Sequence, residues 1–301
     1  MRLIVYTAPP VGERIAPPPQ VGILEGDRVH EIEGEPWMDL GDLLRSGVTP
    51  SPAADSRALD AVILQAPLGG PGKVVCVGLN YHDHCREQGI QPPAYPMLFA
   101  KFGNAVNHPG AEIVRPAATE KLDLECELAV VIGRTASHIA AGQALDHVFG
   151  YTILNDITMR DLQREDRQWL RAKGADGFAP IGPAVVTRDE LGDGRGLRVR
   201  SSVNGELWQD STTDEMVFDV PTLVAFISSF VRLEPGDLIA TGTPAGVGHY
   251  QHPPRYLRDG DLLRCEIDGI GVLENRVVDA LPRIADHDRA AGVQPALAGP
   301  R

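Results

Sequence analysis

Polar and apolar residues alternate from Asp123 to Leu128, and this alternation constrains the fold more than any other feature of the chain. A period of two is typical of a β-strand, on which successive side chains point to opposite faces. A strand over residues 123–133 therefore places Asp123, Glu125 and Glu127 on one face. Carboxylates that project the same way repel one another, so either solvent or a bound cation must screen them. An edge strand with a solvated acidic face and a metal site both remain open at this point.

A second segment favours the metal site. Residues 150–156 form a short apolar run that ends on Asp156, and the polar residues 158–167 follow as a predicted helix. Asp156 thus lies at a strand end, where the side chains of a site are often presented. With Glu125 and Glu127 it forms an oxygen-only set, which Mg²⁺, Mn²⁺ or Ca²⁺ prefer, whereas zinc prefers nitrogen or sulfur. We therefore predict a divalent metal site with these three carboxylates as ligands.

Further sequence blocks follow in one order between about residue 73 and the region of Asn275. The blocks are Gly78-Leu79-Asn80-Tyr81, His84 and Glu87, Lys101, residues 123–133, residues 155–163, residues 173–183, Asn204-Gly205, residues 233–237, residues 239–248 and residues 259–261. Any single block is a weak motif, but the ordered set is specific. On these blocks the chain resembles the fumarylacetoacetate hydrolase family. The resemblance implies an α+β, predominantly β fold, namely a mixed β-sandwich roll that carries its site in the mouth, with a small N-terminal domain.

The resemblance also implies roles for individual residues. Glu125, Glu127 and Asp156 match the metal-binding carboxylates of the family, for which Mg²⁺ or Mn²⁺ is expected, with Ca²⁺ as an alternative. His84 and Glu87 match its catalytic pair. On a predicted short helix, residues three apart face one way, so the carboxylate can orient the imidazole as a general base.

Other residues are expected to contact the substrate. Lys173 matches a lysine near the family's metal, and a buried ammonium there can hold a developing oxyanion. Arg160 and Gln163 fall one helical turn apart, where the arginine fork can grip a carboxylate, and residues 241–243 offer hydroxyl and N–H donors. Solvated helix residues and a simple tight turn are the alternatives for these two groups. The expected substrate contacts are Tyr81, Lys101, Arg160, Gln163, Thr241, Gly242 and Thr243.

Departures from the family pattern bear on the substrate. Gly174, Ala175 and Gly177 stand where the family commonly has a bulkier residue and a threonine, and Phe102 stands where proline is frequent. The pocket is therefore expected to be roomier or less polar than is usual in the family.

The cysteines are widely spaced and form no Cys-x-x-Cys motif, so we expect buried free thiols. They are Cys76, Cys85, Cys126 and Cys265. Cys85 follows His84 directly, but adjacent residues on a helix or strand point apart, which argues against a Cys–His nucleophile.

Charge limits the partners that the chain can have. The formal net charge is −13 over 301 residues and no long basic run occurs, which argues against nucleic acid and anionic membranes as partners. The first residues are broken by prolines and charges and do not form a signal peptide, so we expect a cytoplasmic protein. Its expected partner is a small-molecule keto acid, and the resemblance implies a homodimer.

Three regions are expected along the chain. A small N-terminal α/β domain covers residues 1–70, with strands near 2–6 and 20–32 and a helix near 39–45. A strand-rich catalytic domain covers residues 71–284, with a helix near 220–230. Residues 285–301 lack apolar periodicity and are expected to be a disordered tail.

The leading functional hypothesis is a metal-dependent hydrolase that cleaves a carbon–carbon bond of an acylpyruvate- or fumarylpyruvate-type 1,3-diketo acid. In this hypothesis His84 and Glu87 activate water, while the metal and Lys173 stabilise an enolate. The alternative is a decarboxylase, tautomerase or dehydratase of a 2-oxo or 2-hydroxymuconate-like diacid, which uses the same metal site without an attacking water. A non-catalytic small-molecule binder is the third hypothesis, because one fold can host many functions.

Overall fold

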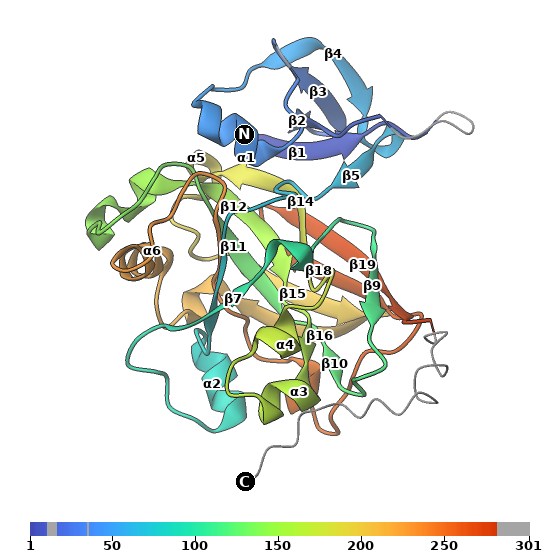
Figure 1. The fold of residues 1–301 in the computed structure, drawn as a ribbon, viewed down its shortest axis with the longest axis vertical. Coiled ribbons are helices and arrows are strands. Elements are labelled where there is room, and N and C mark those ends of the chain that lie inside the picture. Colours follow the sequence, from blue (N-terminus) through green and yellow to red (C-terminus); the bar gives the residue numbers. More distant parts are fainter. Residues whose placement is uncertain (11–16, 35, 282–301) are drawn as a thin grey trace, which may run out of the picture.

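The computed structural model describes residues 1–10, 17–34 and 36–281. The predicted tail, residues 285–301, lies outside these residues. Within them the molecule consists mainly of β-strands with short helices between them (Figure 1). The fold is thus of the predicted α+β, predominantly β class. No helix among the described residues combines the length and the apolar character that a membrane crossing requires.

One large sheet runs through the molecule. Its strands, in the order in which they pair, are β4 (Pro52–Ala58), β3 (Arg28–Ile32), β2 (Gln20–Glu25), β1 (Arg2–Thr7), β14 (Ala179–Thr187), β12 (Val148–Asn155), β11 (Cys126–Ile132), β17 (Leu238–Ala240), β6 (Val74–Gly78) and β7 (Met97–Lys101). Two more strands attach to it, β5 (Ile63–Gln65) to β1 and β8 (Val106–Asn107) to β14. Strands β1–β4 lie at one end of the molecule (Figure 1) and join the sheet through β1 and β14. The domain division near residue 70 stays a prediction.

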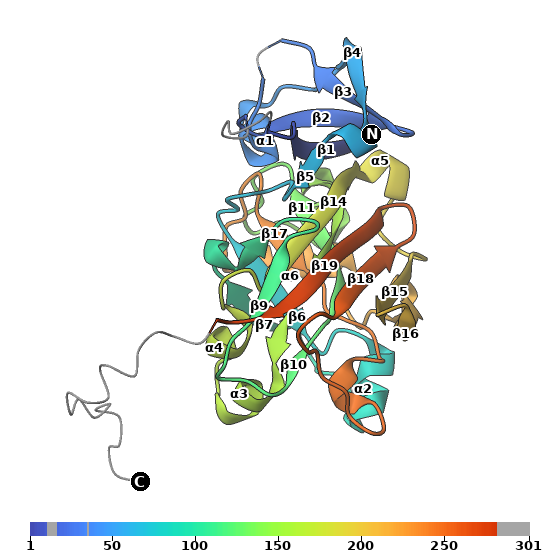
Figure 2. The ribbon, with the colours of Figure 1, turned by 90° about the vertical axis from the view of Figure 1, so that its right-hand side faces the viewer.

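Two smaller sheets complete the strand framework. The five-stranded sheet consists of β16 (Glu206–Thr212), β15 (Arg198–Val203), β18 (Leu262–Ile267), β19 (Gly271–Asp279) and β9 (Glu112–Arg115). The two-stranded sheet consists of β10 (Leu122–Asp123) and β13 (Thr158–Met159). Figure 2 shows β18 and β19 crossing in front of the large sheet. The predicted turn at Asn204-Gly205 connects β15 to β16, where both residues adopt the positive φ that a tight hairpin needs.

Short helices occupy the connections between strands. The α-helices are α1 (Leu40–Ser46), α2 (His82–Gln88), α3 (Arg160–Glu165), α4 (Leu170–Lys173), α5 (Arg188–Leu191) and α6 (Val220–Ser228). The 3₁₀ helices are η1 (Leu59–Ala61), η2 (Gly103–Ala105), η3 (Ala141–His147), η4 (Thr213–Glu215) and η5 (Gly248–Tyr250). Helix α2 ends at Gly89, which adopts a left-handed conformation, and its N–H bonds back to the last turn. Helices α2, α3 and α4 lie at the end of the molecule opposite β1–β4 (Figure 1).

Strand β11 is buried on both faces, because layers of the molecule pack on each side of it. Leu128 and Val130 point into a core shared with β15, β18 and α6. Ala129 and Val131 point into a second core shared with α1 and the N-terminal strands. This position explains why an unbroken apolar run follows the alternating segment. It also excludes the solvated edge strand that the sequence left open, since β12 and β17 pair with β11 on either side.

The expected single strand over residues 123–133 is wrong, because the chain changes sheets within it. Leu122 and Asp123 pair with β13 in the small sheet, and β11 of the large sheet begins only at Cys126. The predicted helix at 158–167 is likewise shorter, because its first two residues pair in that small sheet. The four cysteines are buried and free, as expected.

Gly150 provides a test of the packing between β12 and β14. A Cβ atom at this position would lie 2.2 Å from the Val186 carbonyl oxygen, so a side chain must push the two strands apart. We expect Gly150→Ala to lower the free energy of unfolding by about 1–3 kcal/mol. Gly142→Ala is the matched control, because no atom lies within 4 Å of its added Cβ. Denaturant unfolding measures both variants, and equal stabilities would contradict this view of the β12–β14 contact.

Candidate active site

Three buried carboxylates meet where β11 begins and β12 ends. Glu125 immediately precedes β11, Glu127 is its second residue, and Asp156 immediately follows β12. The pairing of Cys126 with Asn155 brings these positions together, and the Asp156 N–H donates to the Glu125 carbonyl over 2.9 Å. One oxygen of each carboxylate lies within 4.8 Å of those of the other two. The structure therefore brings together the three predicted metal ligands.

Asp123 faces a different set of partners. Its carboxylate accepts hydrogen bonds from the backbone N–H groups of Gly248 and His249, each over 2.9 Å, and from Arg160 Nε over 2.9 Å. The chain changes sheets after Asp123, and the Asp123 carboxylate is not part of the group formed by Glu125, Glu127 and Asp156. Through its hydrogen bonds it fixes η5 beside α3.

Two buried lysines hold the carboxylates in place. Lys173 Nζ lies 2.8 Å from Glu125 Oε2, 2.7 Å from Asp156 Oδ2 and 2.7 Å from Thr158 Oγ1. Lys101 Nζ lies 2.7 Å from Asp156 Oδ1 and donates to the backbone carbonyls of Lys173 and Phe178. Both oxygens of Asp156 therefore face an ammonium group, and Lys101 lies behind the carboxylates rather than on the cavity wall.

Arg160 is engaged by the protein's own carboxylates. Besides its bond to Asp123, its Nη2 lies 2.6 Å from Glu125 Oε1, and its Nη1 donates to Gln163 Oε1 over 3.0 Å. Arg160 and Gln163 nevertheless both line the cavity. In this structure the guanidinium thus connects Asp123 to Glu125 across the floor of the site.

The carboxylates differ in the charge that surrounds them. Burial alone would raise the pKa of Glu125, but Arg160 and Lys173 together lower it to about 2. Burial, with the nearby charges of Asp156 and Glu125, instead raises the pKa of Glu127 well above its usual value. The Glu127 side chain accepts one hydrogen bond, from the Gly242 N–H over 2.9 Å.

The charge balance suits a divalent cation. Four buried carboxylates, including Asp123, face three buried cations, Lys101, Arg160 and Lys173, so one carboxylate has no cationic partner. That carboxylate is Glu127, whose raised pKa favours the protonated form unless a cation takes the place of the proton. Buried charges in low dielectric are costly unless they are paired or coordinate a metal. An oxygen-only set in which one carboxylate lacks a cationic partner is the environment that Mg²⁺ and Mn²⁺ prefer. The residues present therefore fit the expected metal.

His84 is held at both of its ring nitrogens. Its Nδ1 lies 2.5 Å from Glu87 Oε1, and the other oxygen of Glu87 accepts the Gly246 N–H over 2.9 Å. The Gln88 amide nitrogen lies 2.8 Å from His84 Nε2, and the Tyr250 hydroxyl donates to the Gln88 oxygen over 3.0 Å. With the amide as donor, Nε2 accepts and the ring proton lies on Nδ1, facing Glu87. The unprotonated nitrogen thus accepts the Gln88 amide in this structure, and it becomes available to a ligand in the cavity when that hydrogen bond opens.

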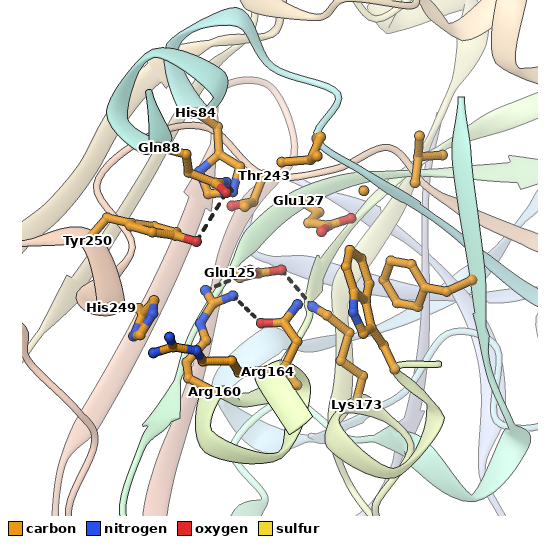
Figure 3. A pocket seen from close by; sticks show the side chains of 16 residues that line it. His84, Gln88, Glu125, Glu127, Arg160, Arg164, Lys173, Thr243, His249 and Tyr250 are labelled. Carbon is orange, nitrogen blue, oxygen red and sulfur yellow. Dashed lines mark hydrogen bonds and ion pairs between the residues drawn. The ribbon is translucent and has the colours of Figure 1, made fainter. Parts of the chain in front are cut away.

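A cavity of 420 Å³ connects the imidazole with the carboxylates (Figure 3). Its wall includes seven of the predicted site residues, namely His84, Glu125, Glu127, Arg160, Gln163, Lys173 and Thr243. Phe99 and Trp169 form an apolar side beside Lys173, whose Nζ lies 5.0 Å from the Phe99 ring centre. Phe102, where the family pattern was expected to change the pocket, is largely exposed and outside this wall.

The other predicted site residues lie behind the wall and support it. Glu87 and Asp156 hold His84 and Lys173, as described above. Tyr81 is fully buried, and the Thr241 hydroxyl donates to the Leu128 carbonyl over 2.8 Å. Gly242 contributes its N–H to Glu127. Gly242 also has a positive φ, at which a Cβ would lie 2.9 Å from the Val77 carbonyl oxygen, so glycine is required there.

Four polar residues of the cavity wall were not predicted from the sequence: Gln88, Arg164, His249 and Tyr250. A signal for two of them was present, because Gln88 is one helical turn from His84, and Arg164 is one turn from Arg160. His249 and Tyr250 directly follow the glycine-rich block 239–248, but only the fold shows that this block approaches Asp123.

Comparison with known proteins agrees with this architecture. Residues 73–278 match the family described as "Fumarylacetoacetate (FAA) hydrolase C-terminal". The protein named oxaloacetate tautomerase FAHD2B, mitochondrial, of Bos taurus is 47% identical over 219 residues, which span 72% of this chain and 70% of the bovine protein.

Solved structures with the same fold are similar to nearly the whole chain. A fumarylacetoacetate hydrolase from Exiguobacterium antarcticum has a TM-score of 0.81 at 38% identity, covering 92% of this chain and all of that one. A 2-hydroxyhepta-2,4-diene-1,7-dioate isomerase from Mycobacterium marinum has a TM-score of 0.77 at 37% identity, covering 94% of this chain and all of that one.

Substitution of Glu127 tests whether the carboxylates hold a metal. Saturating Mn²⁺ should raise the melting temperature of the unsubstituted protein by about 5 °C, because it binds only the folded state. Glu127→Gln should abolish this shift without lowering the metal-free melting temperature, since the amide oxygen still accepts the Gly242 N–H and a repelling charge is removed. Thermal unfolding with and without Mn²⁺ measures both effects.

The control for this test is Glu112→Gln, which alters an exposed carboxylate and should keep the Mn²⁺ shift. A full shift in Glu127→Gln would place the metal elsewhere.

Proposed function

Because the chain belongs to the fumarylacetoacetate hydrolase family, we propose that it is a divalent-metal-dependent enzyme that interconverts the keto and enol forms of a short 2-oxo diacid. The observation that carries this proposal is the position of His84. Its imidazole, oriented by Glu87, lines the same cavity as Glu125 and Glu127. A general base and a site for a hard cation therefore face the same cavity and can act on the same bound molecule.

The metal would be held by Glu125, Glu127 and Asp156. Bound there, Mg²⁺ or Mn²⁺ supplies Lewis-acid charge that favours the enolate form of a 2-oxo acid. The ion's identity within this group is part of the proposal.

The protein's own groups carry the proton transfer. Once the Gln88 amide moves off His84 Nε2, this nitrogen takes a proton from the carbon next to the keto group and returns it to oxygen or carbon, so that no atom is gained or lost. Glu87 keeps the ring oriented and stabilises the imidazolium that forms. The Lys173 ammonium, whose pKa is raised by Asp156 and Glu125 despite its burial, stays charged. Its three donors face Glu125, Asp156 and Thr158, so it can stabilise the developing oxyanion through its charge. Phe99 and Trp169 reduce the access of water on that side.

Carbon–carbon bond hydrolysis of an acylpyruvate-type acid is the second candidate. It uses the same enolate, but His84 and Glu87 would activate water. The cavity of 420 Å³ favours this candidate, because it leaves room for an acyl group and a water molecule beside a four-carbon acid. The names of the bovine relative and of the mycobacterial structure, a tautomerase and an isomerase, support the first candidate. Decarboxylation of the same diacid is a variant of the first candidate, because it uses the same metal site without an attacking water.

Location and assembly remain part of the proposal. The cytoplasmic location stays a prediction, and the bovine relative is named as a mitochondrial protein. A homodimer is proposed on the family resemblance alone.

A metal-controlled substrate panel tests the proposal. The protein is assayed with Mg²⁺ and with EDTA against oxaloacetate, fumarylpyruvate and simple acylpyruvates, and the products are identified. Metal-dependent decay of the oxaloacetate enol without loss of carbon supports tautomerisation. Pyruvate with a second acid would establish the hydrolase instead, and carbon dioxide would establish decarboxylation. No turnover of any of these acids with Mg²⁺ would overturn the proposed function.

Substitution of His84 tests its role as base. His84→Asn should lower the turnover rate at least a hundredfold, because a positioned general base contributes about 10²–10⁴-fold. The Mn²⁺-induced thermal shift should be retained, since His84 is not among the three predicted ligands.

The matched control is His82→Asn, which changes an exposed histidine on the same helix and should keep full activity. Near-normal turnover in His84→Asn would assign the proton transfer to another group.

A further inference from the structure

An arginine at the mouth of the cavity has no hydrogen-bond or ion-pair partner among the residues that the structure describes. Arg164 follows Arg160 by four residues, so both side chains lie on one face of α3. Arg160 is buried and paired with Asp123 and Glu125. Arg164 is exposed, lines the cavity, and makes no hydrogen bond or ion pair with any residue that the structure describes. Its five N–H donors are therefore available to a ligand.

A second donor stands beside it. The backbone N–H of His249 is fixed by Asp123, and its ring nitrogen Nδ1 lies 2.9 Å from the Tyr256 hydroxyl. With the tyrosine as donor, Nδ1 accepts and Nε2 carries the ring proton, which can then be donated to an anion. The ring packs edge-on against Tyr250 at 4.9 Å, so its orientation is restricted.

The surroundings of His249 show that this end of the cavity is positive. Burial lowers the pKa of His249, and the charges of Arg160, Lys121 and Arg164 lower it further, against the opposing charge of Asp123. Three cationic side chains therefore act on one half-buried ring. Such a potential attracts anions into the cleft.

The positive end and the metal end lie on opposite sides of Glu125. Figure 3 shows Arg164 and His249 on one side of Glu125, with Glu127 and Lys173 on the other. A molecule whose 2-oxo acid end sits at the buried carboxylates can therefore reach Arg164 and His249 with its far end inside the same cavity. Arg160 is less suited to the second contact, because three of its five N–H donors already face Asp123, Glu125 and Gln163 and its charge is balanced by the two carboxylates.

We propose that Arg164 and His249 form a subsite for the second carboxylate of a dianionic substrate, and that Arg164 sets the preference for diacids over monoacids. The inference rests on the proposed function, which places the 2-oxo acid end at Glu125, Glu127 and Asp156.

A pair of substrates that differ only in the second charge tests the subsite. Oxaloacetate carries both carboxylates, whereas its 4-methyl ester keeps the 2-oxo acid end and lacks the distal charge. Arg164→Gln should lower kcat/KM for oxaloacetate about tenfold, the size of one charge-assisted hydrogen bond at an exposed site, and should change that for the ester less than about twofold. The loss should shrink at high salt.

Further variants separate the subsite from general damage. Arg167→Gln removes an exposed arginine three residues away that does not line this cavity, and it should leave both substrates unaffected. Arg164→Lys should keep part of the preference for the diacid. His249→Phe should reduce that preference in the same direction as Arg164→Gln. Equal losses for diacid and ester, or no loss in Arg164→Gln, would overturn the inference.

Equilibrium binding decides the inference separately from turnover. Calorimetric titration of the Mg²⁺-loaded protein with oxaloacetate and with the ester should show weaker binding of only the diacid in Arg164→Gln. If the unsubstituted protein turns over neither compound, the proposed function fails, yet a selective loss of diacid binding would still support the subsite. Unchanged diacid binding in Arg164→Gln would refute the subsite whatever the turnover shows.

Discussion

The burial of carboxylates at one junction of two sheets is the constraint on which the rest of the structure depends. Glu125, Glu127 and Asp156 lie within 4.8 Å of one another and away from solvent. Their mutual repulsion requires compensation, and Lys101 and Lys173 provide part of it through short contacts. A divalent cation would remove the remaining repulsion and leave the site with a net positive charge for an anionic ligand. The elements that carry these side chains are buried on every side, which keeps the geometry rigid.

Much of the site could be predicted, because strand alternation and helical spacing are visible in the local sequence. Alternation placed Glu125 and Glu127 on the same side of a strand, and the end of an apolar run placed Asp156 at a strand terminus. The helical spacing of His84 and Glu87 indicated contact, and the two side chains meet at 2.5 Å. Each of these relations depends on neighbours in the sequence, which a period of two or of 3.6 residues describes well.

The remainder depended on contacts between distant segments. The alternation continues through Leu124, so nothing in the sequence shows that the chain changes sheets there and turns Asp123 toward Arg160. His249 reaches the cavity only because Asp123, more than a hundred residues earlier, binds its backbone. Helical spacing predicted that the Arg160 guanidinium faces the site. It could not predict that the guanidinium pairs with two carboxylates of the protein itself.

One arrangement can serve both chemistry and selectivity: a metal site at the buried end, His84 on the wall, and Arg164 with His249 at the mouth. The central claim is that the three carboxylates bind one divalent cation. The most direct measurement is a crystal structure of the Mn²⁺-soaked protein with anomalous diffraction. The account predicts a single strong peak about 2.1–2.2 Å from oxygens of Glu125, Glu127 and Asp156. A peak elsewhere, or none at these three residues under saturating Mn²⁺, would contradict it.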